Sequence, residues 1–231
     1  MKKAIPVNIL KALAALDTCT VSNAIDTLRL RLRNEGYTDT SIRCMSPSLP
    51  PMVGHAVTVR IRCSSPQPEG HAYIDRTDWW AHLRSIPAPR VVVIQDMDAH
   101  PGTGAFPGEV HASIWRAMGC VGAITNGAVH DLHQVARSGF HLFASGLTAS
   151  HAYAHIVGYG EPVEIGGLMI APGDLLHGDV NGVVSIPEAA VEQVPDIAAK
   201  LLRRERSVLD LCASEGFTLE ALLKAVEAPL E

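Results

Sequence analysis

The sequence predicts a single α/β domain over residues 1–231, for three reasons. Two continuous apolar runs, "RVVVIQD" and "CVGAIT", are typical of buried strands. An amphipathic stretch, "EVHASIWRAMG", lies between them, and strands that alternate with helices indicate the α/β class. Hydrophobic residues make up 47% and charged residues 19% of the chain, so it can bury a large core and disorder is not expected. No repeat or linker-like stretch divides the chain, which favours one domain.

The N-terminal segment, about residues 6–32, is expected to form two helices, the second starting at Thr20 or Ser22. The first residues, "MKKAIPVNILKALAALDTC", begin like a signal peptide, with lysines before apolar residues. Proline and polar residues interrupt the apolar run and no A-x-A cleavage site follows, so an amphipathic helix is favoured. No apolar run approaches the ~20 residues that span a bilayer, and the sequence predicts no membrane partner.

The middle of the chain is expected to alternate strands and helices. Residues 53–63, "VGHAVTVRIRC", alternate apolar and polar side chains and predict a strand. A helix is expected over 77–85 and a buried strand over 90–98. The next helix, from residue 109, is expected to stop at Gly119, as a C-terminal glycine does, before the strand "CVGAIT".

The last third of the chain combines short strands with helices. Residues 162–187 contain GG, PGD and NG turns, which predict several short strands in a meander. From about 187 to 228 the apolar residues follow a helical pattern, and the charged face of "KLLRRERS" is expected to be solvated.

The net charge and the cysteine pattern indicate which classes of partner to expect and in which cellular compartment the protein acts. The 19 basic and 24 acidic residues give a net charge of −5, and no basic run is interleaved with aromatics, so no nucleic-acid partner is expected. Five cysteines lie far apart without a CxxC pair. That pattern suits reduced thiols and predicts a cytoplasmic protein.

A glycine- and proline-rich loop, residues 99–108, connects a predicted strand to a predicted helix. The first amides of such a helix, at the positive end of its dipole, suit a carboxylate or phosphate. The loop lacks the lysine of a P-loop and the third glycine of a dinucleotide fingerprint. A tight turn alone would also explain its glycines. Glu109 either complements the helix dipole or acts as a base beside the anion site.

The stretch "TNGAVHDLHQV" places His130 and Asp131 after an Asn-Gly turn. Asp131 with Gln134 has the form of a capping box, so the pair could start a helix or form a reaction centre. His151 and His155 have the i, i+4 spacing of zinc ligands on a helix, but the glutamate of HExxH is absent. An amphipathic helix is therefore favoured there over a zinc site. No G-x-S-x-G elbow supports a serine hydrolase.

Several stretches together resemble one known family. Gly108-Glu109 is followed after twenty residues by His130-Asp131, and "PGDLLHGDVNGVVSIP" comes later. This ordered set resembles the signature of the proteins grouped with regulator of ribonuclease E activity A and the class II, metal-dependent 4-hydroxy-4-methyl-2-oxoglutarate aldolases. The similarity is densest from about Arg90 to Pro187. It implies a β/β/α sandwich of the swivelling phosphohistidine-domain type. It also implies a homotrimer, or a hexamer of two trimers, with the site near a subunit interface.

The resemblance also implies roles for individual residues. Asp131 would hold Mg²⁺ or Mn²⁺, largely through waters, because hard ions prefer oxygen ligands. The backbone amides of Gly108, Glu109, Val110 and His111 would bind the carboxylate of a small 2-oxo acid. Glu109 would handle protons through water. Stabilising a pyruvate enolate would then permit retro-aldol cleavage or oxaloacetate-type decarboxylation, both of which release pyruvate.

Two positions depart from the family pattern. The family's arginine is His130 here, and the aspartate before its glycine is Asn126. Arginine carries a permanent charge and a fork of donors, whereas a free histidine is mostly uncharged at neutral pH. Other arginines could replace the missing charge in space: Arg60, Arg62, Arg76 and Arg90.

Three interpretations therefore stay open. The favoured one is a divergent metal-dependent lyase, in which His130 acts as acid–base or binds a different oxo acid. The second is a non-catalytic member that binds an oxo acid or another protein. The third is a metal site of another class that uses some of the eleven histidines.

Overall fold

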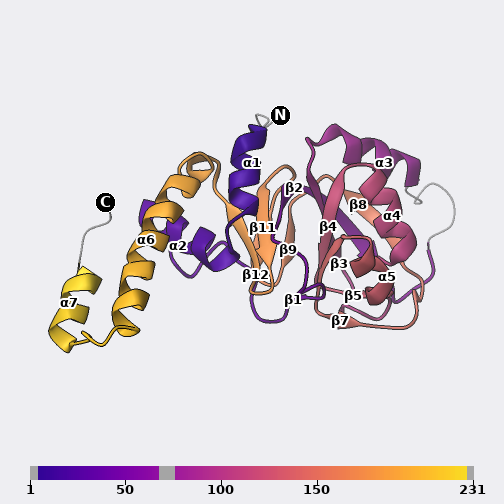
Figure 1. Ribbon diagram of the computed structural model, residues 1–231. Helices are drawn as coiled ribbons and strands as arrows, with labels where there is room; N and C mark the ends of the chain where they lie inside the picture. Colours follow the sequence, from indigo (N-terminus) through magenta and orange to yellow (C-terminus); the bar gives the residue numbers. More distant parts are fainter. Residues whose placement is uncertain (1–4, 68–75, 228–231) are drawn as a thin grey trace.

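The computed structural model describes residues 5–67 and 76–227, and parallel strands form its centre. Their order across the sheet is β6–β4–β3–β2, so each crossover moves one strand along. The crossover helices cover the same face of the sheet (Figure 1). The strands are β2 (Met52–Arg62), β3 (Arg90–Asp96), β4 (Cys120–Thr125) and β6 (His141–Ala144), and the helices are α3 (Arg76–Ser85), α4 (Glu109–Ala117) and α5 (Leu132–Arg137).

The other edge of β2 is shared between two antiparallel strands. Residues 52–55 pair with β11 (Leu175–Asp179), and residues 59–62 pair with β8 (His155–Tyr159). β12 (Gly182–Ile186) extends the sheet beyond β11. At the far side β1 (Arg43–Cys44) pairs with β6, and an isolated bridge from Tyr37 to Val184 links the segment that precedes β1 to β12. The sheet is therefore nearly closed.

Two apolar cores fill the two sides of this sheet. On the helix side, Trp79, Leu83 and Trp115 pack against strand residues such as Val92. On the other side lies the hairpin of β9 (Val163–Ile165) and β10 (Leu168–Ile170), which packs against side chains that include Val91 and Phe143. A small parallel pair, β5 (Ala128–Val129) and β7 (Gly146–Leu147), lies beside β6. The prediction of a mixed α/β domain is confirmed.

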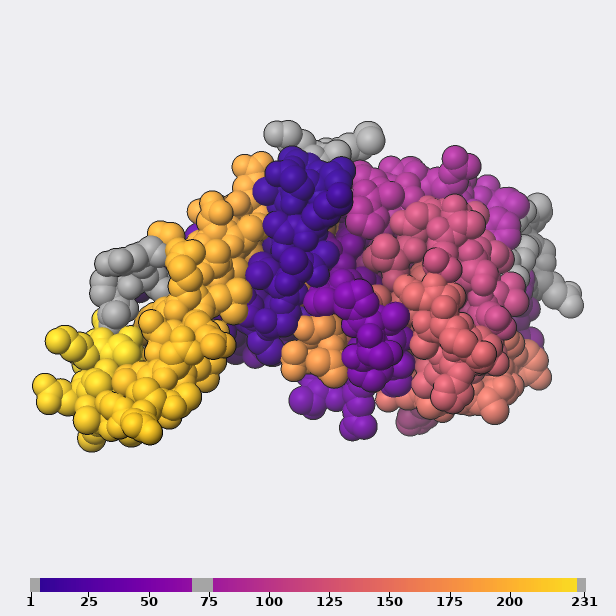
Figure 2. All heavy atoms as spheres, in the orientation of Figure 1, coloured from indigo at the N-terminus to yellow at the C-terminus, as the bar shows by residue number. Residues whose placement is uncertain are grey.

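Helices from both ends of the chain meet on β11 and β12. A third core lies there, formed by α1 (Val7–Ala14), α2 (Thr18–Leu28) and α6 (Val194–Cys212). A short 3-10 helix, η2 (Glu188–Ala190), connects β12 to α6. The end of α6 and α7 (Leu219–Glu227) project from the body (Figures 1 and 2). α2 begins at Thr18, not at Thr20 or Ser22, because Asp17 accepts a hydrogen bond from the Thr20 amide at 2.8 Å and caps the helix.

The structure also bears on the expectations about membrane spans and cysteines. Across the described ranges, no helix is both long enough and apolar enough to cross a bilayer. All five cysteines are unpaired, with Cys63 and Cys120 buried in the core.

A buried histidine joins the N-terminal helices to β11. His177 is fully buried, and its Nε2 lies 3.0 Å from the Leu13 carbonyl, which can only accept, so Nε2 carries the proton. Its Nδ1 then accepts from the Thr18 hydroxyl at 2.9 Å. Next to it, Asp179 accepts from the Thr18 amide at 2.8 Å. Burial lowers the pKa of His177, although Asp179 and Asp17 favour its charged form.

This arrangement predicts a pH-dependent stability. The folded-state pKa lies below the ordinary 6.5, so the unfolded chain binds more protons and the free energy of unfolding falls as pH drops below about 6.5. His177→Asn is expected to lower the free energy of unfolding at pH 8 by about 1–3 kcal/mol and to flatten its pH dependence. Urea unfolding from pH 8 to pH 5 measures both effects. The exposed His133→Asn is the control, and an unchanged slope in His177→Asn would contradict the assignment.

Candidate functional site

The residues predicted to form the site line one cavity at the carboxyl ends of the parallel strands β3 and β4, the end at which parallel sheets of α/β proteins commonly bind ligands. The cavity measures about 470 Å³. All six predicted residues line it, together with side chains that the sequence interpretation left out. The lining residues are Gln67, Phe106, Gly108, Glu109, Val110, His111, His130, Asp131, His151, Ala152, Tyr153 and Ala154.

Asn126 fixes the turn after β4 against the end of β3. Its Oδ1 accepts from the Asp96 amide at 2.7 Å, and its Nδ2 donates to the Asp96 carbonyl at 3.0 Å. An ionised aspartate could make only the first of these bonds. The asparagine that replaces the family's aspartate at position 126 therefore has a structural role of its own.

A helix, α5, does begin directly after Asp131, as the capping-box pattern indicated, but the side chain of Asp131 does not form the capping box. Asp131 adopts a left-handed backbone, with φ of 56°, just before α5, and its side chain caps no amide of that helix. Its Oδ2 instead accepts from the Glu109 amide at 3.1 Å, at the start of α4. The carboxylate therefore meets the positive end of a different helix dipole.

The absence of a side chain at Gly108 leaves room for the side chains of His130 and Asp131. A Cβ at this position would lie 2.3 Å from His130 Nε2 and 2.8 Å from Asp131 Oδ2. Its φ of −145° is open to any residue, so space alone requires glycine here. Gly108 of the Gly-acid pair therefore packs directly against His130 and Asp131.

His151 was missed as a site residue, because the sequence was interpreted as a helix over 151–155. Residues 151–154 instead form a turn, with Ala152 at φ 47°, and His155 begins β8. The His151 ring lies edge-on to His130, with 4.4 Å between centroids. The two residues are 21 positions apart, and no spacing rule connects them.

The amides that could bind an anion belong to the first turn of α4. Glu109, Val110 and His111 are its first three residues, whose amides have no acceptor within the helix. The Glu109 amide already faces Asp131. The His111 ring packs between Phe106 and Trp115, at centroid distances of 4.9 and 5.3 Å, which holds this turn in place.

No arginine or lysine lines the cavity among residues 5–67 and 77–227. Arg60 pairs with Glu161, and Arg90 donates to backbone carbonyls, including that of Met118, at the opposite end of β3. Arg62 is absent from the lining, and the Arg76 side chain lies outside the described part. The described arginines therefore do not replace the family's arginine at His130.

Asp131 suits a hard divalent ion better than the buried Cys63–Asp96–Asp98 group does. Asp98 accepts from the Cys63 and Ser64 amides, and Asp96 accepts from the Gly102 amide, so these carboxylates organise the loop. Burial raises the pKa of the Cys63 thiol to about 12, which keeps it protonated. The Asp131 side chain is 38% exposed beside an open cavity, with room for the waters that Mg²⁺ keeps.

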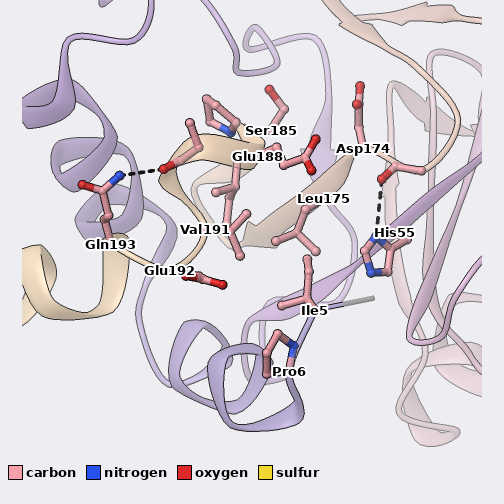
Figure 3. Close-up of a pocket in the computed structure, with 14 residues that line it drawn as sticks. Ile5, Pro6, His55, Asp174, Leu175, Ser185, Glu188, Val191, Glu192 and Gln193 are labelled. Carbon is pink, nitrogen blue, oxygen red and sulfur yellow. Dashed lines mark hydrogen bonds between the residues drawn. The ribbon is translucent and has the colours of Figure 1, made fainter. Parts of the chain in front are cut away.

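A second cavity, of about 410 Å³, lies at the other end of β2 (Figure 3). His55 hydrogen-bonds the Gly173 carbonyl there, near Asp174, Glu188 and Glu192. None of the predicted site residues lines it, and it is separate from the candidate site.

A comparison with known protein families matches the part of the chain that contains the candidate site. A family model described as "RraA-like: Aldolase/RraA" matches residues 18–185, which include the whole site. The chain belongs to the RraA-like family. The resemblance found in the sequence is confirmed.

The RraA-like chain has relatives of known name and of known structure. It is 32% identical over 113 residues to the "Putative 4-hydroxy-4-methyl-2-oxoglutarate aldolase" of Halalkalibacterium halodurans, a match that covers 47% of this chain and 54% of that relative. It therefore spans about half the length of this curated relative.

Two solved structures share the RraA-like fold at lower identity. An uncharacterized protein from Pseudomonas syringae pv. tomato str. DC3000 has a TM-score of 0.75 at 23% identity, covering 97% of this chain and 96% of that one. RraAS2 of Streptomyces coelicolor, described as an unusual member of the RNase ES inhibitor RraA protein family, has a TM-score of 0.69 at 22% identity, covering 89% and 98%. At these identities the likeness concerns the fold.

Proposed function

We propose that this RraA-like chain is a divalent-metal-dependent carbon–carbon lyase that releases pyruvate from a small 2-oxo acid. The observation that carries the proposal is the Asp131 carboxylate, 3.1 Å from the first amide of α4 inside a 470 Å³ cavity. An acidic oxygen ligand and an anion-binding helix end are the two features that a metal-assisted cleavage of an oxo acid requires. The 32% identity to a protein named as an aldolase supports the same reaction class.

In the proposed mechanism, Asp131 would hold Mg²⁺ or Mn²⁺. Such an ion, when bound, stabilises the negative charge of an enolate. The amides of Gly108, Glu109, Val110 and His111 would orient the substrate carboxylate on α4. His130, or Glu109 through water, would accept the proton of the C4 hydroxyl as the C3–C4 bond breaks. Both side chains line the cavity beside Asp131, as this role requires.

The alternative is a non-catalytic protein that binds an oxo acid or another protein. One observation favours it, because His130 stands at the arginine position and no described arginine lines the cavity. Loss of a charged hydrogen bond in a transition state can cost on the order of a hundredfold or more in rate. Such a protein would still bind 2-oxo acids but would not cleave them.

Three further features of the proposal concern fold type, assembly and compartment. The order of helices, sheet and β9–β10 hairpin supports the swivelling phosphohistidine type. Apolar side chains exposed on the projecting helices support a homotrimer or hexamer, which the sedimentation mass in solution would test. They are Leu202, Leu209, Leu219, Leu223 and Val226. The unpaired cysteines support the cytoplasm.

Pyruvate release from 4-hydroxy-4-methyl-2-oxoglutarate and from oxaloacetate tests the proposal. We expect the native chain to release pyruvate with Mg²⁺ and to stop when a chelator is added. The variant His130→Arg is assayed beside it. Release by the variant alone would show an intact site whose natural substrate is another compound. Absence of release by both proteins from these substrates and from the monocarboxylate 4-hydroxy-2-oxopentanoate, with 2-oxo acids still bound, would favour the non-catalytic alternative.

A further inference from the structure

We propose that the site accepts 2-oxo acids with a single carboxylate and an uncharged distal group, and discriminates against dicarboxylates. This inference rests on the proposed lyase function and names its substrate class. It follows from the distribution of charge in the cavity. Two side chains that carry negative charge when ionised, Glu109 and Asp131, line the cavity, and no described arginine or lysine does.

One carboxylate can be accommodated at the start of α4. A second one, at the far end of the substrate, would have to leave water near Glu109 without an arginine or lysine side chain of the described residues as partner. Burying a charge without a partner is costly, and placing it beside like charges adds to that cost.

The part of the lining that residues 152–154 contribute suits an uncharged group. This wall combines the methyl groups of Ala152 and Ala154 with the ring of Tyr153, which is 57% exposed. Phe106 contributes a second aromatic ring to the lining. An alkyl or aryl substituent would lose little hydration and gain contact area here.

His151 gives this wall a fixed hydrogen-bonding group. Its Nδ1 lies 2.7 Å from the Ala105 carbonyl, which can only accept, so Nδ1 carries a proton and Nε2 is the ring nitrogen left for a ligand. The turn is held close to the loop by the Ala105 amide, which donates to the Ser150 carbonyl at 2.9 Å. A Cβ at Gly104 would lie 2.3 Å from the His151 carbonyl oxygen, so this close packing requires glycine. The imidazole rings of His130 and His151, which lie 4.4 Å apart between centroids, can bind a hydroxyl of the substrate.

The reaction follows from this substrate class. In a 4-hydroxy-2-oxo acid, the C4 hydroxyl gives its proton to a base and the C3–C4 bond breaks. C4 becomes the carbonyl carbon of a released aldehyde or ketone. The electron pair of the bond stays with C3 as the enolate, which takes up a proton to become the methyl group of pyruvate. No oxidant or reductant is needed.

Two ligands of equal length test the inference by binding alone. 2-Oxopentanoate and 2-oxoglutarate differ only in a distal methyl group against a distal carboxylate. Calorimetric titration with Mg²⁺ present is expected to show 2-oxopentanoate bound more tightly by about tenfold or more. His130→Arg is expected to reduce or reverse this preference. His133→Arg adds the same charge on exposed α5, outside the cavity lining, and is expected to leave the preference unchanged.

Turnover separates this inference from the proposed function. Pyruvate release is expected to be faster from 4-hydroxy-2-oxopentanoate than from 4-hydroxy-4-methyl-2-oxoglutarate. Equal or tighter binding of 2-oxoglutarate, or faster cleavage of the dicarboxylate, would overturn the inference and leave the lyase function standing. If neither ligand binds and neither substrate yields pyruvate, both are wrong.

Discussion

Asp131→Asn is expected to reduce metal-dependent pyruvate release by at least about a hundredfold while the chain stays folded. The expected loss is large because the substitution removes the anionic oxygen proposed to hold the ion, whose charge stabilisation is worth several kcal/mol. Folding should survive because the asparagine Oδ1 can still accept from the Glu109 amide, as the Asp131 carboxylate does at 3.1 Å.

Initial rates over a range of Mg²⁺ concentrations, together with Mn²⁺ binding followed by electron paramagnetic resonance, measure this prediction. Asp196→Asn removes an exposed carboxylate in the first turn of α6 and serves as the matched control. If Asp131→Asn keeps both Mn²⁺ binding and turnover, Asp131 is not the metal ligand.

Gly108→Ala is also expected to reduce the rate of pyruvate release by about a hundredfold, for a different physical reason. The new Cβ would occupy the space of His130 Nε2 and Asp131 Oδ2, at 2.3 and 2.8 Å, so both side chains must move. Displacing reacting groups by about 1 Å can cost on the order of a hundredfold in rate. The backbone of residue 108 is extended, so α4 should form as before.

Gly158→Ala provides the comparison for this variant. A Cβ at residue 158, in β8, meets nothing within 4 Å, so its turnover and melting temperature should match those of the native chain. Gly108→Ala should retain the native melting temperature within a few degrees but lose turnover and Mn²⁺ binding. Native turnover in Gly108→Ala would show that the contact with His130 and Asp131 does not matter for the reaction.

Local patterns predicted the elements that pack on one another in chain order. The apolar runs at 90–98 and 120–125 became β3 and β4, and the intervening amphipathic stretch became α4. These segments are long and buried, so periodicity and burial indicate the same structure. The ordered motif from Gly108 to Asp131 likewise predicted residues that meet in one cavity.

Long-range contacts decided the features that local patterns missed. His155 pairs with Arg62 of β2, and this strand pairing prevents the helix that the spacing of His151 and His155 favoured. Asp131 has the local form of a capping box, but its carboxylate meets the amide of Glu109, 22 residues earlier. Neither partner can be identified from the neighbouring sequence, because each contact depends on how distant segments pack.

The two-partner edge of β2 has a consequence for the synthesis of the protein. β2 ends at Arg62, whereas β8 and β11 begin at His155 and Leu175. A ribosome that adds ~5–20 residues per second leaves this apolar edge unpaired for roughly 5–20 s before β8 is made. Unpaired edges of that kind are templates for intermolecular strand pairing. This edge is therefore open to intermolecular strand pairing while the chain is still being translated, before the sheet can close.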